Sequence, residues 1–407
     1  MTQPRSAALV VVMLSTVLAL TSCTSPKEGA ADGGSTTSSR LETTSTVKEP
    51  EQFTGIDEDF YVAPDPLPHG EPGELIRIQD LGEQAGQHTV RVMYHSRDAQ
   101  DKDRAVTGIV TYPTAEPPEG GWTVTSQANG TVGVASQCAP SRNGEPAGDW
   151  GIEGVHAQTD YIGLGPVGEI HPYLSGPSEG NSVIDAVRAA RNLADAHAGK
   201  AWFSVGHSQG GHGAIFAGER AQMYAPELDL LGTVALAPAT ELTKTYGPVD
   251  EVVSRVVGVM MVYGASGEHP EIRFEDYAGP ALLAVKDVFE TGCLDQIIAA
   301  TAGITGDKFY AHDPLKTQPA AGLLKLNQPG LVVSDAPLFL AQGTEDERVN
   351  VHRTEDYFAR VCRLGQVADL VVMEGENHGS IVGASAEASS KWMKARLAGE
   401  PAPDSCP

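Results

Sequence analysis

Two serines in this chain lie in a Gly-x-Ser-x-Gly pattern, which can present a serine hydroxyl as a nucleophile toward a carbonyl carbon. Ser178 is at the centre of Gly176–Gly180, and Ser208 is at the centre of Gly206–Gly210. The chain has 45 glycines among 407 residues, so the pattern alone is weak support for either serine. The residues on each side must therefore decide which serine could react.

The flanking residues favour Ser208. It follows a short apolar run at residues 201–205, which is typical of a buried strand, and it precedes a helical stretch at residues 213–224. A sharp turn between a strand and a helix lifts a serine hydroxyl above the sheet. Ser178 has Pro177 directly before it and no predicted strand upstream, so we interpret it as a loop serine entering a helix.

A reactive serine needs a histidine as base and an acid that orients the histidine, and in this setting they follow in the order serine, acid, histidine. Asp346 lies in a loop after the apolar run 336–341, and His378 lies in a loop after the apolar run 369–373. His352 is the other histidine beyond Asp346, but it lies near the start of a predicted helix, too close in sequence to reach back over the sheet. Asp346 and His378 are therefore the predicted partners.

Together these residues would cleave a carbonyl substrate through an acyl-enzyme. His378 would take the proton of Ser208 and return it to the leaving group, while Asp346 would hold the imidazole in one tautomer. The backbone N–H of Gln209, directly after the nucleophile, would be one donor to the oxyanion. The loop at residues 128–133, which follows an earlier predicted strand, would supply the second donor.

Further short segments combine glycines, aromatic residues, histidines and cysteines in a characteristic order: Phe60-Tyr61, Asn129–Gly133, Cys138–Ser141, Asp160–Gly165, His171–Leu174, Gly206–Gly211 and Gly343–Asp346. With these segments, which span roughly residues 55–395, the chain resembles the secretory lipase family of α/β-hydrolases, the lipase A type. The resemblance implies hydrolysis of carboxylic esters, often acylglycerols, with Ser208, Asp346 and His378 as the catalytic residues.

The same resemblance implies a second oxyanion donor near Val132, with Thr131 as the neighbouring possibility. The chain departs here from many relatives, which have His-Gly-Thr-Thr-Gly where it has Asn129 and Val132. A backbone donor survives a side-chain change, so this departure bears on the shape of the acyl pocket rather than on activity.

The amino end predicts export. An apolar run at residues 7–20 follows Arg5 and is shorter than the about 20 residues that a bilayer-spanning helix needs. It is typical of a signal peptide, residues 1–23, and its end, Leu-Thr-Ser-Cys, resembles a bacterial lipobox in which Cys23 is lipidated. Residues 24–50 are rich in Ser, Thr and Gly, which predicts a disordered tether. The alternative is ordinary secretion after cleavage, without an anchor.

Five cysteines in an exported chain leave one unpaired, and lipidation of Cys23 would account for it. The remaining four allow three pairings, between which the spacing does not choose. The family resemblance suggests Cys138 with Cys293 and Cys362 with Cys406.

The order of the predicted elements indicates an α/β protein. Residues 89–96 and 104–112 are typical of an antiparallel strand pair. From residue 122 onward, strands alternate with helices such as the one predicted over 181–198, which implies a mostly parallel central sheet flanked by helices. We therefore expect an α/β-hydrolase core over residues 51–240 and 331–407.

Some 90 residues separate two predicted strands of this core, although one helix of about a dozen residues suffices for a crossover. We interpret residues 241–330 as an inserted helical cap above the active site. Its apolar stretch 252–263 and its amphipathic stretch 281–289 could form an acyl-binding lid or simply the core of the cap itself. Both interpretations stay open.

The charge pattern narrows the partners. The net charge of −25 falls on residues 51–407, with 24 basic and 49 acidic side chains, which argues against nucleic acid or an anionic lipid surface. No spacing typical of a zinc site or a phosphate loop is present, so we expect no metal or cofactor. We expect a monomer that acts on a small-molecule or lipid ester, either on the outer face of the bacterial cytoplasmic membrane or secreted.

Two alternative functions stay open. The same catalytic group could transfer the acyl chain to another acceptor or cleave an amide, because one triad serves several reactions. A non-catalytic lipoprotein that binds lipid in the cap is the alternative from a different functional class.

Overall fold

The computed structural model describes residues 49–244 and 251–407. The predicted signal peptide with Cys23, and the tether as far as residue 48, lie outside the described residues. Within the described part of the chain, no helix is both long enough and apolar enough to cross a membrane.

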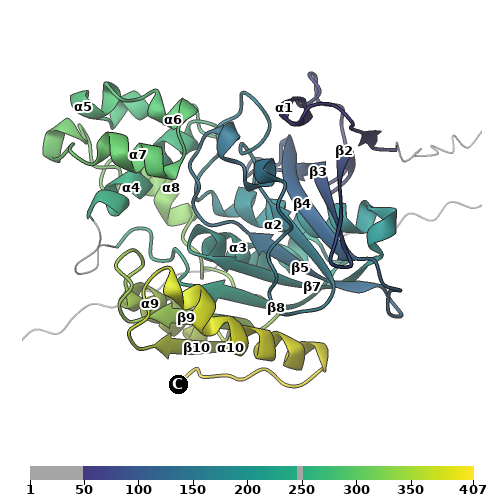
Figure 1. The fold of residues 1–407 in the computed structure, drawn as a ribbon. Helices are drawn as coiled ribbons and strands as arrows, with labels where there is room; N and C mark the ends of the chain where they lie inside the picture. Colours follow the sequence, from purple (N-terminus) through teal and green to yellow (C-terminus); the bar gives the residue numbers. More distant parts are fainter. Residues whose placement is uncertain (1–48, 245–250) are drawn as a thin grey trace, which may run out of the picture. The chain divides into compact units, whose positions relative to one another are not determined.

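The described residues contain a mixed sheet of ten strands (Figure 1), in the spatial order β1-β2-β3-β4-β6-β5-β7-β8-β9-β10. The strands β2, β3, β4 and β6 pair antiparallel, and the neighbours from β6 to β10 pair parallel. This confirms the predicted antiparallel pair, now β3 and β4, and the mostly parallel sheet. The strands are β1 (Glu51–Gln52), β2 (Leu75–Gln84), β3 (Gln87–Arg97), β4 (Asp103–Pro113), β5 (Trp122–Ala128), β6 (Val155–Thr159), β7 (Ala198–His207), β8 (Asp229–Leu236), β9 (Leu338–Gly343) and β10 (Ala368–Met373).

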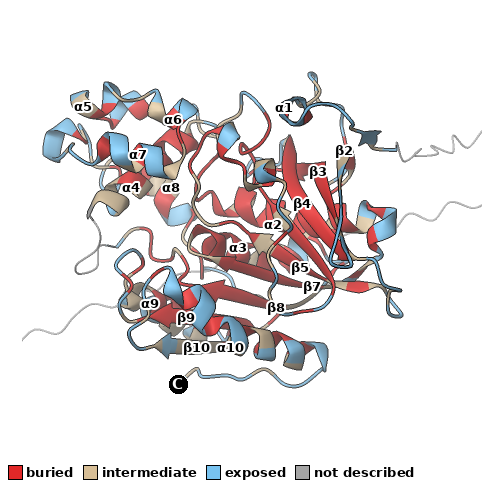
Figure 2. Ribbon diagram, in the orientation of Figure 1, coloured by how far each residue is buried: buried red, intermediate tan, exposed pale blue. Residues whose placement is uncertain are grey.

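Helices cover both faces of the sheet. Side chains on a strand point alternately to opposite faces, so one strand contributes to the apolar clusters on both sides. In β7, Trp202 joins the cluster of α2 and α3, whereas Phe203 and Val205 join the cluster of α10. The strands between these layers are buried along most of their length (Figure 2). The helices of this core are α1 (Asp57–Phe60), α2 (Gly176–Asn192), α3 (Gln209–Tyr224), α9 (Val351–Arg363) and α10 (Ser380–Leu397), with 3-10 turns η1 (Ser136–Cys138), η2 (Pro140–Asn143) and η3 (Ala194–Ala196).

The chain between β8 and β9 leaves the sheet and forms a group of short helices (Figure 1, green). These helices have an apolar cluster of their own, in which the rings of Tyr263, Phe274 and Phe289 lie with centroids 5.4 Å apart. Tyr173 and Leu174, from the segment before α2, pack in the same cluster. The elements are α4 (Glu251–Ala265), η4 (Phe274–Asp276), α5 (Pro280–Leu283), α6 (Val288–Thr291), α7 (Leu294–Thr301), η5 (Gly306–Lys308) and α8 (Ala320–Leu326).

One predicted helix differs in its bounds. The helix expected over 181–198 begins five residues earlier, at Gly176, and ends at Asn192. Pro177 in its first turn is tolerated because the first N–H groups of a helix have no partner inside it. The amphipathic stretch 281–289 falls on α5 and α6, which are separated by a turn.

Candidate active site

The turn that carries Ser208 has the predicted strand–turn–helix form. β7 ends at His207, α3 begins at Gln209, and Ser208 between them has φ 60° and ψ −118°. A non-glycine residue in this region is strained, and such strain concentrates at functional sites. A Cβ on Gly210 would collide with the carbonyl oxygen of Ala128 at the end of β5, so the turn can approach the neighbouring strand only with glycine there.

His378 and Asp346 meet at the ends of β10 and β9. His378 Nδ1 lies 2.8 Å from Asp346 Oδ2, and both side chains are buried. The N–H groups of Arg348 and Val349 donate to Asp346 Oδ1, each at 2.8 Å, and Gln342 Nε2 donates to Oδ2 at 3.0 Å.

These bonds determine the protonation of the pair. Burial raises the pKa of Asp346, but the hydrogen bonds from His378 and from the two N–H groups outweigh burial and leave the pKa below its ordinary value. An ionised carboxylate can only accept, so Nδ1 of His378 carries a hydrogen. The neutral ring then has its lone pair on Nε2, where a base is needed.

His207, which precedes Ser208, ties the His378 loop to the turn. Its Nε2 donates to the carbonyl oxygen of His378 at 2.7 Å, and the two ring centroids are 4.5 Å apart. Burial, and the charge that His378 carries when protonated, lower the pKa of His207 to about 4. In the sequence, His207 stands out only through its position directly before Ser208 in the Gly-x-Ser-x-Gly pattern.

Within the described residues, the hydrogen bonds of this group join Asp346 to His378 and His378 to His207, and none joins the Ser208 hydroxyl to His378. The backbone around Ser208 is nevertheless well held, because its N–H donates to Leu236 at 2.9 Å and its carbonyl accepts from His212 at 3.2 Å. His352 lies elsewhere, with its Nδ1 2.7 Å from Glu355 on the exposed side of α9.

The loop expected to supply the second oxyanion donor runs beside the turn. Tyr161 donates its hydroxyl to the carbonyl oxygen of Asn129 at 2.8 Å, and Thr131 Oγ1 lies 2.8 Å from the hydroxyl of Tyr173. The carbonyl oxygen of Val132 accepts from the N–H of Leu294, at the start of α7, at 2.8 Å. The loop is thus held by the sheet on one side and by the inserted helices on the other.

Both disulfides implied by the family resemblance are present. Cys138 in η1 is bonded to Cys293, the residue before α7, with the Cα atoms 5.5 Å apart. Cys362 in α9 is bonded to Cys406 near the carboxyl end. The first disulfide joins the chain that follows the loop at residues 128–133 to the inserted helices.

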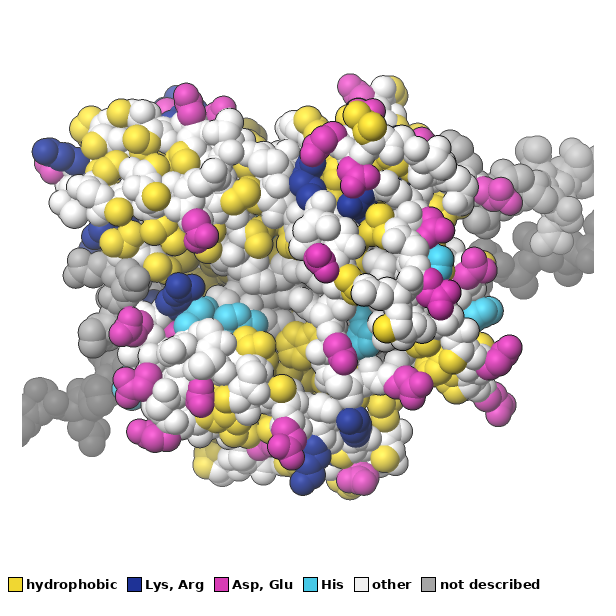
Figure 3. All heavy atoms as spheres, in the orientation of Figure 1, with side chains coloured by type: hydrophobic (Ala, Val, Ile, Leu, Met, Phe, Trp, Pro, Cys, Tyr) yellow, Lys and Arg dark blue, Asp and Glu magenta, His cyan; other side chains and the backbone are white. Residues whose placement is uncertain are grey.

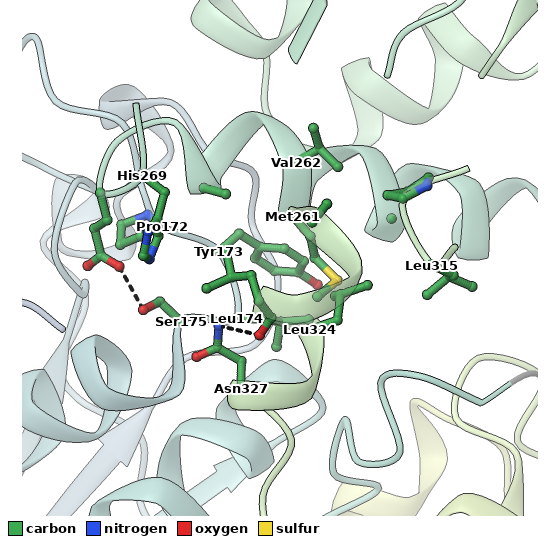
Figure 4. A pocket seen from close by; sticks show the side chains of 16 residues that line it. Pro172, Tyr173, Leu174, Ser175, Met261, Val262, His269, Leu315, Leu324 and Asn327 are labelled. Atoms are coloured by element: carbon green, nitrogen blue, oxygen red, sulfur yellow. Dashed lines mark hydrogen bonds between the residues drawn. The ribbon is translucent and has the colours of Figure 1, made fainter. Parts of the chain in front are cut away.

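A small apolar pocket lies between the inserted helices and the segment before α2 (Figure 4). Its volume is about 40 Å³, which is room for a few groups the size of a water molecule. Tyr173 lines it, and its hydroxyl contacts Thr131 in the loop expected to supply the second oxyanion donor. On the surface above, apolar side chains gather over the inserted helices (Figure 3, yellow, upper left). The other lining residues include Leu174, Met261, Val262, Leu315 and Leu324, with Glu268 and Asn327 as polar members.

Comparisons with known proteins bear on the family and on the fold. A family model described as secretory lipase matches residues 153–405. A probable inactive lipase of Mycobacterium tuberculosis is 24% identical over 86% of this chain and 83% of its own length. The secreted triacylglycerol lipase LIP4 of Malassezia globosa is also 24% identical, over the same shares of the two chains. The closed form of Candida antarctica lipase A superposes with a TM-score of 0.70 at 19% identity, covering 84% of this chain and 86% of that one.

The superposition confirms the predicted α/β-hydrolase fold. Since the family model covers more than half of the sequence, this chain belongs to the secretory lipase family.

Proposed function

We propose that this protein hydrolyses carboxylic esters, either acylglycerols or other lipid esters, through an acyl-enzyme. Ser208 is the nucleophile, His378 is the general base and then the general acid, and Asp346 orients the imidazole. The observation that supports this assignment most directly is the 2.8 Å bond between His378 Nδ1 and Asp346 Oδ2, at strand ends tied to the strained turn of Ser208.

In the proposed reaction, His378 Nε2 removes the proton of Ser208 as its oxygen attacks the ester carbonyl. The resulting oxyanion accepts from the N–H of Gln209 and from a second donor near Val132 or Thr131. His378 then protonates the departing alcohol. Water, deprotonated by the same ring, releases the acid, and Asp346 stabilises the imidazolium in both steps without taking its proton.

The inserted helices, residues 241–330, are proposed as a cap that shields the acyl-enzyme from water. The apolar pocket beneath them, and the bond from Tyr173 to the oxyanion loop, support an acyl chain directed toward this side. The pocket is narrow as it stands, so a long chain would require the cap to rearrange.

We further propose that the protein is exported and acts as a monomer. The name of the Malassezia relative supports export, as does the apolar run at residues 7–20. Lipidation of Cys23 would keep the enzyme on the outer face of the membrane, and exchange of Cys23 for alanine should then release it into the medium. Unchanged membrane retention of that variant would exclude the lipid anchor.

Hydrolysis of p-nitrophenyl esters from acetate to palmitate, by the wild type and Ser208→Ala, tests the proposal. The wild type should be active and should be labelled by a serine-directed phosphonate, and Ser208→Ala should lose both properties. One relative is named a probable inactive lipase, which makes this direct measurement decisive. A folded wild type with neither activity nor labelling would contradict the proposal and favour a lipid-binding protein, and ester formation with an added alcohol would indicate acyl transfer.

A further inference from the structure

A buried carboxylate lies directly behind the nucleophile turn and has no role in the reaction described above. Glu179, in the first turn of α2, is fully buried. Its Oε1 accepts from the N–H of Leu174 at 3.0 Å and from Nε2 of Gln209 at 2.7 Å. Its Oε2 lies 2.7 Å from Nδ1 of His212, one turn after Ser208 in α3.

The side-chain amide of Gln209 is held from two directions. His171 Nδ1 lies 2.8 Å from the carbonyl oxygen of Ile162, so this nitrogen carries the hydrogen of a neutral ring. Burial lowers the pKa of His171, which favours the neutral form. Its Nε2 then accepts from Nε2 of Gln209 at 2.8 Å, and both amide hydrogens of Gln209 are used, one by His171 and one by Glu179.

His212 ties the same carboxylate to α3. Its Nε2 lies 2.9 Å from the carbonyl oxygen of Asn327, which can only accept, so Nε2 carries a hydrogen. A second hydrogen is shared between Nδ1 and Glu179 Oε2 at 2.7 Å. The two fully buried side chains thus form a neutral pair, and loss of the carboxylate would leave donors of α3 unsatisfied.

We propose that Glu179 is a positioning residue for the hydrolysis proposed above, on which this inference rests. By holding the side chains of Gln209 and His212, Glu179 fixes the first turn of α3 and with it the backbone N–H of Gln209 that meets the oxyanion. It touches no reacting atom and does not line the apolar pocket. Its loss should therefore lower kcat and leave KM nearly unchanged, because the displaced donor acts on the charge of the intermediate.

Gln209→Met and Glu179→Leu test the inference. Gln209→Met keeps the backbone N–H and removes only the anchored amide, and kcat on a short p-nitrophenyl ester should fall about tenfold. Complete loss of an oxyanion donor costs about 10²–10³, so a loosened donor should cost less. Glu179→Leu should lower kcat at least as much. The conservative change Glu179→Gln should keep kcat within about threefold of the wild type, because the new amide can donate to a neutral His212 and keep every contact.

Asp185→Leu is the matched control. Asp185 lies on the same helix, is equally buried, and bonds Ser96, Arg188 and Tyr224, with no contact to α3's first turn. Its loss should lower the melting temperature without changing kcat of the folded enzyme.

Two results would overturn the inference. One is kcat within twofold of the wild type in folded Gln209→Met, the variant that decides the matter if Glu179→Leu does not fold. The other is an equal fall in kcat for Asp185→Leu, which would indicate a general structural role. Ser208→Ala, assayed in parallel, distinguishes a failure of the proposed function from a failure of this inference. Full activity of Ser208→Ala would contradict both the proposed function and this inference. An inactive Ser208→Ala together with an unchanged kcat of Gln209→Met would contradict the inference alone.

Discussion

The two Gly-x-Ser-x-Gly segments share a pattern but occupy different backbone environments. Ser208 lies between β7 and α3 with φ 60°, in a turn that requires glycine at residue 210. Ser178 lies in the first turn of α2, fully buried, where its hydroxyl accepts from the N–H of Ala99 at 2.9 Å and contacts Glu268. The place of the serine makes the difference. Ser208 is itself the positive-φ residue of a turn between a strand and a helix. Ser178 lies inside α2, and the positive φ near it, 58°, belongs to Leu174 before the helix.

The two segments also touch each other. Glu179 of the first segment holds Gln209 of the second through the 2.7 Å bond between the carboxylate and the amide. We propose that the segment around Ser208 carries the nucleophile, and that Glu179 of the other segment positions the residue after it. Four predictions test this division of roles, in order of decreasing effect on activity.

Ser208→Ala should reduce kcat/KM by about 10⁴-fold or more, because removal of the nucleophile leaves only binding and the oxyanion donors. Hydrolysis of p-nitrophenyl butyrate at pH 8 is the measurement. Residual activity above one hundredth of the wild type would mean that Ser208 is not the nucleophile.

Asp346→Asn should lower kcat by about 10³–10⁴-fold near neutral pH, since an amide can donate to His378 and favour the wrong tautomer. Circular dichroism should show an unchanged fold, because Asn still accepts from the N–H groups of Arg348 and Val349. A loss of less than tenfold would place the orienting acid elsewhere.

His207→Phe should lower kcat about tenfold by freeing the carbonyl of His378 from its 2.7 Å bond. It should also change the pH dependence of stability. The pKa of His207 is lowered to about 4 in the folded state, against about 6.5 when unfolded, so the unfolded state binds more protons between these values. Wild-type stability should therefore fall as pH drops from 6.5 to 4, and urea unfolding should show a shallower fall for His207→Phe. An identical pH profile would contradict the assignment.

Ser178→Ala should have the smallest effect, with kcat/KM within about threefold of the wild type. Its melting temperature should fall by a few degrees, because the N–H of Ala99 loses its acceptor and the carboxylate of Glu268 loses a donor. A large loss of activity at full stability would remove the distinction between the two segments.

Much of this arrangement could be predicted from local signals. The strand and helix around Ser208, and the loops that carry Asp346 and His378, follow from short apolar runs that end in polar turns. The parallel order of the strands then places all three residues at one edge of the sheet. The beginning of α2 was missed because Gly176 and Pro177 are typical of loops as well as of helix starts.

Other features depend on contacts between distant segments. β6 (Val155–Thr159) has no clear alternation and forms a strand because β4 and β5 pair with it on both sides. The contacts of Glu179 require α2 and α3 to pack side by side, and the bond from His207 requires the final shape of the His378 loop. No spacing in the sequence encodes these distances.

The disulfide between Cys138 and Cys293 limits how the inserted helices can move. Among the bonds that attach them to the rest of the protein are this covalent bond, the ion pair of Glu241 with Arg360, and the 2.9 Å bond from the N–H of Gly176 to Asn327. The ion pair and the hydrogen bond can break and re-form, but the disulfide keeps Cys293 next to Cys138 in any rearrangement of these helices. In the proposed cap, the start of α7 therefore stays beside η1, and the helices away from this bond are the ones that would move to admit a substrate.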